Sequence, residues 1–137
     1  MLEVAETVVT TLQNDAILSN IQGLKFYDTQ FPNELEEFPF VVVMNETIDA
    51  IGEEKMVYFD RLTVTIMTSS NNNAQLRTIR DAIKSALHGK GFLNDTLKIE
   101  FNCFFNRELP MDLSDLSLKP KPRGSSLRFL VSKIDKE

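Results

Sequence analysis

Residues able to do nucleophilic, acid–base or metal chemistry are few in this chain of 137 residues. His88 is the only histidine and Cys103 the only cysteine. His88 falls in the last turn of a predicted helix, where an imidazole complements the negative end of the helix dipole. Cys103 falls on the apolar side of a predicted strand, where a thiol is buried and inert. Because neither has a chemical partner nearby in sequence, we expect structural roles for both and no enzymatic activity.

One acidic cluster could in principle hold a cation. Asp49, Glu53 and Glu54 lie close together in the segment TIDAIGEEK. They lack the alternating Asp/Asn spacing of a calcium loop, so a solvated hairpin tip is favoured over a metal site. The five glycines form no phosphate-binding loop, and no His/Cys/Asp group has the spacing of metal ligands. We therefore predict no metal and no cofactor.

Three basic residues recur along one predicted helix. Arg77, Arg80 and Lys84 border its apolar stripe, so their stems can cover the edge of the core while the charges stay hydrated. The alternative is that they bind an anionic partner. No aromatic residues interleave with them, which argues against stacking on single-stranded nucleic acid.

A second basic cluster lies near the C-terminus of an acidic chain. Lys119, Lys121 and Arg123 fall within KPKPRG, whose prolines hold the backbone extended. The formal net charge of the whole chain is −5, which disfavours a general affinity for nucleic acid. The cluster is either ordinary solvated surface or one side of a charge-complementary contact. Separate acidic and basic segments would let copies of the chain associate head-to-tail.

The elements that must position these residues follow from the periodicity of the apolar side chains. Helical spacing occurs twice, from Ala5 to Ala16 and from Leu76 to Leu87. A short strand followed by an exposed loop is predicted within LKFYDTQFPNELEEF, and further strands at FPFVVVMNE, MVYFDRLTVTIMTS, TLKIEFNCFF and SLRFLVSKI. This order predicts an α+β fold in a single domain spanning residues 1–137. A mainly antiparallel, mixed sheet carries two helices on one face, with a protruding hairpin and a long loop.

Two segments are predicted to project from this domain. The first is the hairpin tip from Glu46 to Val57, followed by the consecutive apolar residues Val57, Tyr58 and Phe59, which need cover on both faces. We expect that cover to come from another chain. The second is a loop from Asn106 to Gly124, which is long for a compact domain. It carries several leucines, among them Leu113 and Leu116, which with Leu109 have the spacing of a helical turn.

This layout resembles the tail terminator, or tail completion, proteins of long-tailed bacteriophages, the family of the lambda tail protein U. The matching features are a leading helix, FPFVVV after an aromatic and proline-bearing loop, an acidic hairpin into DRLTVTIMTSS, the polar helix NNNAQLRTIRDAIKSAL, and a closing LRFLVSKI. The resemblance covers nearly the whole chain and is one of order, without an invariant motif.

The resemblance implies a hexameric ring in the virion, at the head-proximal end of the tail, assembled in the bacterial host cytoplasm. Such a ring caps the tail tube, ends its polymerisation and presents the surface that docks on the head. The implied partners are further copies of the chain, the tail tube protein and head–tail connector proteins. No membrane and no sequence-specific nucleic acid are implied.

Other functions compete with this one. A different head–tail connector or neck ring protein would bind the portal side, and co-purification with capsid instead of tail tube would identify it. A small non-enzymatic binding domain would work as a monomer or dimer, which its mass in solution would show. An enzyme built from scattered Asp, Glu, Arg and Tyr is disfavoured, because no pair of titratable groups stands out by type and spacing.

Overall fold

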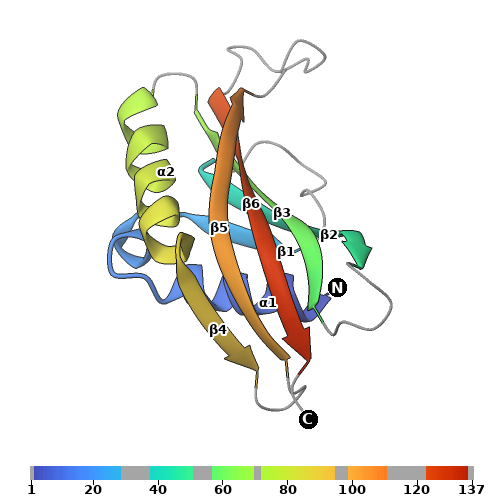
Figure 1. Cartoon of the computed structure of the whole chain (residues 1–137). Helices are drawn as coiled ribbons and strands as arrows, with labels where there is room; N and C mark the ends of the chain where they lie inside the picture. The colour runs from blue at the N-terminus through green and yellow to red at the C-terminus, as the bar shows by residue number, and fades with distance from the viewer. Residues whose placement is uncertain are drawn as a thin grey trace.

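The computed structural model describes residues 2–28, 38–50, 57–69, 72–94, 99–110 and 123–135. Along the chain the elements are α1 (Leu2–Gln13), a short 3-10 helix η1 (Leu18–Asn20), β1 (Lys25–Asp28), β2 (Phe40–Ala50), β3 (Val57–Thr68), α2 (Asn73–Leu87), β4 (Lys90–Asn94), β5 (Ile99–Pro110) and β6 (Arg123–Asp135) (Figure 1). Within these described ranges, no helix combines the length and the apolar character that crossing a bilayer requires.

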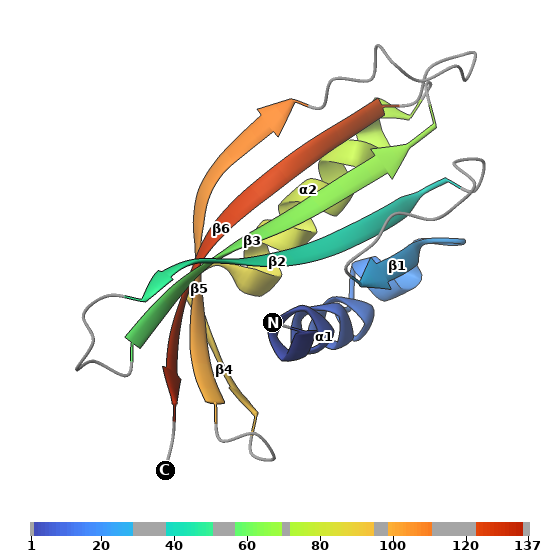
Figure 2. The same ribbon diagram turned by 90° about the vertical axis from the view of Figure 1, so that its right-hand side faces the viewer.

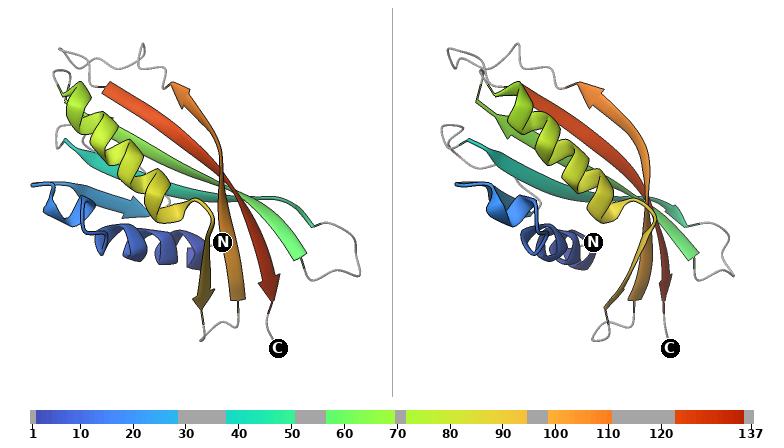
Figure 3. Two further views of the ribbon diagram at one scale, coloured as in Figure 1. Left: turned by 60° about the vertical axis from the view of Figure 1, so that its left-hand side comes forward. Right: turned by 90° about the vertical axis from the view of Figure 1, so that its left-hand side faces the viewer.

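The strands form one mixed sheet in the order β1-β2-β3-β6-β5-β4. Only β1 and β2 run parallel, and every other neighbouring pair is antiparallel. The sheet is strongly twisted (Figure 2), and both helices lie on the same face of it (Figure 3). The predicted α+β fold, with a mainly antiparallel sheet and two helices on one face, is confirmed.

The core lies between the helices and the inner face of the sheet, which is the face toward α1 and α2. From Leu62 to Ile66 of β3, strict alternation places Leu62, Val64 and Ile66 on this face and Thr63 and Thr65 on the other, as the sequence pattern predicts. Phe101 of β5, Ile83 of α2 and Val64 of β3 are at most 1% exposed and belong to one buried cluster. α1 adds Val4, Ala5, Val8 and Leu12 to that cluster.

The start of β2 is covered on both faces. Val41 and Val43 pack in the main core, while Phe40 and Val42 form a second cluster with Met67 of β3 on the outer face. The rings of Tyr27 and Phe38 flank Phe40, with centroids 5.8 and 5.7 Å away. This two-sided cover ends at Val43, because the Met44 side chain is 39% exposed.

Polar side chains and a glycine define the helix ends. Asp15 Oδ2 accepts hydrogen bonds from the backbone N–H groups of Ile17 and Leu18, at 3.0 and 3.1 Å, and so caps η1. Asn72 caps α2, since its Oδ1 accepts from the N–H of Gln75 at 3.3 Å. Gly89 follows the end of α2 with φ of +71°, a conformation that favours glycine.

Three sequence-based expectations are wrong in detail. A strand, β4, follows α2 directly, where no strand is predicted. The backbone N–H of Gly89 donates to the carbonyl of Cys103 at 2.8 Å and starts that pairing. The hairpin tip is shorter than predicted, because β2 continues to Ala50. The loop predicted from Asn106 to Gly124 is also shorter, because β5 continues to Pro110 and β6 begins at Arg123.

Candidate interaction surface

The surroundings of His88 and Cys103 favour structural roles for both residues. His88 follows α2, and its Nδ1 accepts a hydrogen bond from the backbone N–H of Phe105 at 2.9 Å. This hydrogen bond connects the end of α2 to β5, at a point beyond the part of β5 that pairs with β4. Cys103 is fully buried in the core, and burial raises the pKa of its thiol from 9.0 to about 12. At neutral pH this thiol is protonated and inaccessible, so it cannot serve as a nucleophile.

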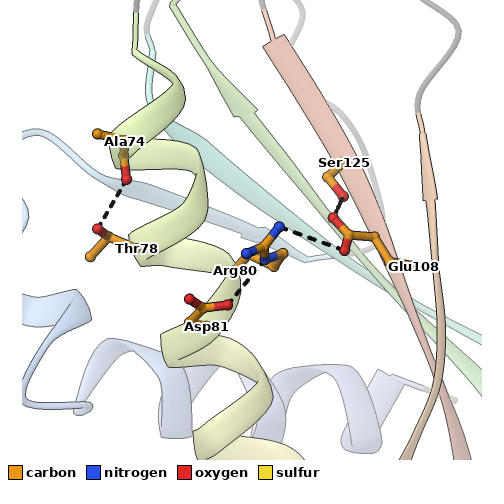
Figure 4. A network of polar contacts seen from close by, with 6 residues as sticks. All are labelled: Ala74, Thr78, Arg80, Asp81, Glu108 and Ser125. Atoms are coloured by element: carbon orange, nitrogen blue, oxygen red, sulfur yellow. Dashed lines mark hydrogen bonds and ion pairs between the residues drawn. The ribbon is translucent and has the colours of Figure 1, made fainter.

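Two of the three basic residues of α2 are engaged within the chain. Figure 4 shows Arg80 between Asp81, whose Oδ1 is 3.1 Å from Arg80 Nε, and Glu108 of β5, whose Oε1 is 3.8 Å from a terminal guanidinium nitrogen. Glu108 Oε2 also accepts a hydrogen bond from Ser125 Oγ of β6 at 2.6 Å. Lys84 Nζ lies 4.3 Å from the ring centroid of Phe105, in cation–π geometry. These contacts favour the core-edge interpretation of Arg80 and Lys84; Arg77 is exposed.

An open depression of about 440 Å³ lies where α2 meets β4 and β5. It is lined by Asp81, Lys84, Ser85, His88, Lys90 and Phe105. His88 and Lys84 both point their polar groups at β5, as described above, and Asp81 binds Arg80. Among the residues that the structure describes, no group of three or more His, Cys, Asp or Glu side chains could hold a metal ion.

The predicted interaction residues fall partly inside the described residues. Asp49 lies in β2, and Val57, Tyr58 and Phe59 open β3. β3 is a central strand whose backbone pairs with both β2 and β6 there: Tyr58 lies opposite Ala50 on one side and Lys133 on the other. From Tyr58 onward, this stretch is therefore paired on both sides within the chain.

The remaining predicted residues belong to the tip and the loop. Glu53, Glu54, Leu113, Leu116, Lys119 and Lys121 lie outside the described residues. Arg123 does not belong to a loop, since it is the first residue of β6, opposite Thr68 of β3, with an exposed side chain. Leu109 lies in β5 opposite Ser126, so the helical turn predicted from Leu109 onward does not begin there.

The outer face of the sheet carries a surface that the sequence analysis missed. Met44, Phe104 and Leu130 are 39%, 46% and 37% exposed, and Leu130 lies directly opposite Phe104 across the β5–β6 pair. Phe104 directly precedes Phe105, and Leu130 directly follows Phe129. Both Phe105 and Phe129 lie on the inner face. Two adjacent apolar residues in an otherwise alternating strand are the signal that could have revealed this surface.

The comparisons with known proteins give a match to a solved structure. No family model matches the chain, and no curated protein matches it. The chain is similar to a chain in the structure of the virion of a native gene transfer agent particle, with a TM-score of 0.67 and 19% sequence identity. The match covers 97% of this chain and 94% of that one. At this identity the match shows a shared fold over essentially the whole length of both chains.

Proposed function

We propose that this protein is a structural component of a phage-like virion, without enzymatic activity, and that it acts as the tail terminator. In this role copies of the chain form a hexameric ring that caps the tail tube, stops its polymerisation and provides the surface that docks on the head. Its partners are its own copies, the tail tube protein and the head–tail connector proteins.

The observation that carries the proposal is the fold match over nearly the full length of both chains to a component of a gene transfer agent virion. The order of elements in the sequence independently resembles the tail terminator family. The chemistry of the described residues agrees, because the histidine and the cysteine are both engaged in holding the fold.

The contacts between subunits are proposed to involve the projecting segments. One is the acidic hairpin with Asp49, Glu53 and Glu54 and the apolar start of β3 at Val57, Tyr58 and Phe59. The other is the segment between β5 and β6, with Leu113 and Leu116 as apolar anchors and Lys119, Lys121 and Arg123 as charges. The hairpin end of β2 and β3 lies away from both helices, where a neighbouring subunit can reach it (Figures 2 and 3).

Electron microscopy of particles that carry a gold-labelled copy of the protein tests this function. We expect label at the head-proximal end of the tail, and we expect removal of the protein to give over-long tails or tails that fail to join heads. Label on the portal side, with tails of normal length, would instead identify a neck connector. Absence of label from the particle would refute a virion role altogether.

A further inference from the structure

The outer face of the sheet brings two arginines directly opposite each other. In β5 the register shifts between Phe105 and Arg107, which marks a β-bulge. As a result Arg107 pairs with Arg128 of β6, and the preceding pair on this face is Phe104 with Leu130. Like charges directly opposite each other across two strands destabilise a sheet, so this pair needs a favourable contact elsewhere. Bulges commonly serve to aim a side chain in this way.

The surroundings within the described chain do not supply that contact. No ion pair to Arg107 or Arg128 is formed among the described residues, and the buried Nε of Arg128 has no hydrogen-bond acceptor there. The carboxylate of Glu46, on the same face, lies 3.6 Å from Arg61.

These residues form two neighbouring rows of the sheet register. One row is Glu46, Arg61, Leu130 and Phe104, and the next is Met44, Thr63, Arg128 and Arg107. We call these eight residues the arginine face. It holds three arginines against one acid, and it holds the three exposed apolar side chains Met44, Leu130 and Phe104. An occupant that matches this face presents several carboxylates together with aliphatic side chains.

We infer that the arginine face receives the acidic β2–β3 hairpin of a second copy of this chain. The inference rests on the proposed self-assembly and names the surface that one subunit offers to the next. The hairpin sequence TIDAIGEE combines Asp49, Glu53 and Glu54 with two isoleucines, which is the chemistry that the face requires. The chain is acidic overall, so a cationic, partly apolar face on it is complementary to another copy.

The geometry fits a head-to-tail contact. The hairpin lies at one end of β2 and β3, beyond the helices, whereas the arginine face extends across the middle of the sheet to β5 (Figure 2). The two surfaces are therefore different parts of one subunit. A contact between two different surfaces is heterologous, and repetition of it closes a ring when the rotation allows.

Charge exchange between the two surfaces tests the inference. The face variant is Arg107→Glu with Arg128→Glu, which keeps a like-charged pair in place and so leaves the repulsion within the sheet unchanged. The hairpin variant is Asp49→Lys with Glu53→Lys and Glu54→Lys.

Sedimentation velocity of the whole chain measures self-association. We expect each variant alone to associate about a hundredfold more weakly than the parent, since opposed like charges are strongly unfavourable. An equimolar mixture should recover association, because each altered surface then meets a complementary one.

Two controls keep the result interpretable. Arg77→Glu with Lys90→Glu changes the net charge by the same amount at exposed positions away from the arginine face and should associate like the parent. Phe104→Asp probes the same face without touching Arg128, in case the face variant fails to fold. Circular dichroism and thermal melting establish folding for every variant.

The possible outcomes separate this inference from the proposed function. A folded face variant that associates like the parent overturns the inference, and so does a mixture that stays dissociated. In either case rings formed by the parent, and label at the tail end, would leave the tail-terminator function standing. A parent that stays monomeric at all concentrations overturns the inference too, and the labelled-particle experiment then judges the function independently.

Discussion

Cys103 is the residue whose environment most clearly decides its chemistry. Its side chain lies on the inner face of β5, in the cluster that also holds Phe101 and Val131. Moving a thiolate into such surroundings costs solvation free energy, which is why its pKa rises from 9.0 to about 12. The sequence predicts this burial correctly from the alternation of TLKIEFNCFF alone.

We therefore predict that Cys103 resists alkylation in the native protein. At pH 8 its modification by a thiol reagent should proceed at the rate of protein unfolding, and it should become fast in denaturant. The unfolded thiol ionises as the pH rises past about 9, while the folded thiol stays protonated up to about pH 12. The unfolded state then binds fewer protons, so this residue lowers stability progressively between these pH values. Cys103→Ala should lack this contribution; fast native-state alkylation would contradict the burial.

Glu108 is the residue that connects three elements. It receives a hydrogen bond from Ser125 of β6 and faces Arg80 of α2. The Arg80 and Glu108 side chains are 29% and 36% exposed, so their 3.8 Å ion pair contributes little stability. The ion pair instead orients the two side chains. The β-bulge that turns Arg107 to the outer face leaves Glu108 on the inner face, toward α2. Neither position could be assigned from the sequence, because a bulge shifts the alternation without a local signature.

At the scale of elements, α2 is defined by its ends. Its first residues follow a run of polar residues that offers several candidate N-caps, and the structure selects Asn72. At the other end Gly89 allows the chain to turn sharply from the helix into β4. These two ends fix how far along the sheet the helix reaches and thus which residues cover β3, β5 and β6.

We predict that Asn72→Ala destabilises the protein by about 1 kcal/mol, because an N-terminal backbone N–H of α2 loses its acceptor. Urea unfolding monitored by circular dichroism measures this. Asn73→Ala is the matched control, since Asn73 is exposed and lies just inside the helix, where alanine is well tolerated. A larger loss for Asn73→Ala than for Asn72→Ala would reassign the cap.

The sequence predicts the long elements well and the short ones poorly. The second half of β3 alternates from Leu62 to Ile66, Leu127, Phe129 and Val131 of β6 share one face, and α2 has a continuous apolar stripe, so these inner-face residues are predicted correctly. β4 has only five residues, KGFLN, whose apolar and polar side chains do not alternate. Contacts with neighbouring parts of the fold stabilise it as a strand. Phe92 stacks on Phe101 with centroids 5.0 Å apart, and a Cβ at Gly91 would lie 2.8 Å from Asn102 Oδ1. Such contacts depend on tertiary packing, which local sequence does not encode.

The same limit applies to the candidate site. The sequence shows where charges cluster along the chain, and this led to the acidic hairpin and to KPKPRG. It does not show which residues of separate strands become neighbours. Arg107 and Arg128 are 21 positions apart in the sequence, and only the register of β5 with β6 brings them together.

At the scale of the whole molecule, opposite charges are separated on a chain with a net charge of −5. Asp49, Glu53 and Glu54 lie in the hairpin segment, whereas the arginine face and KPKPRG are basic. In the proposed ring, this distribution lets the hairpin of one subunit meet a basic surface of the next. It also makes the strength of association depend on ionic strength, because exposed charges are screened within about 8–10 Å at physiological salt.

The segment KPKPRG gives a prediction at this scale. Lys119→Glu with Lys121→Glu should leave the fold intact, because the sequence predicts a surface loop here and such loops tolerate changes of charge. Arg123 is omitted, since it opens β6 and reversing its charge would test the strand as well as the loop. We expect the double variant to assemble or dock on tails more weakly, with a defect that changes with salt concentration, as is typical of charges that act through complementarity. Complementation of particles that lack the protein measures this, with circular dichroism confirming the fold.

Lys119→Arg with Lys121→Arg keeps the charge and should complement fully. If the Glu variant yields normal numbers of infectious particles, KPKPRG is ordinary solvated surface. Assembly must then depend on the hairpin and the arginine face, whose exchange experiment does not involve this segment.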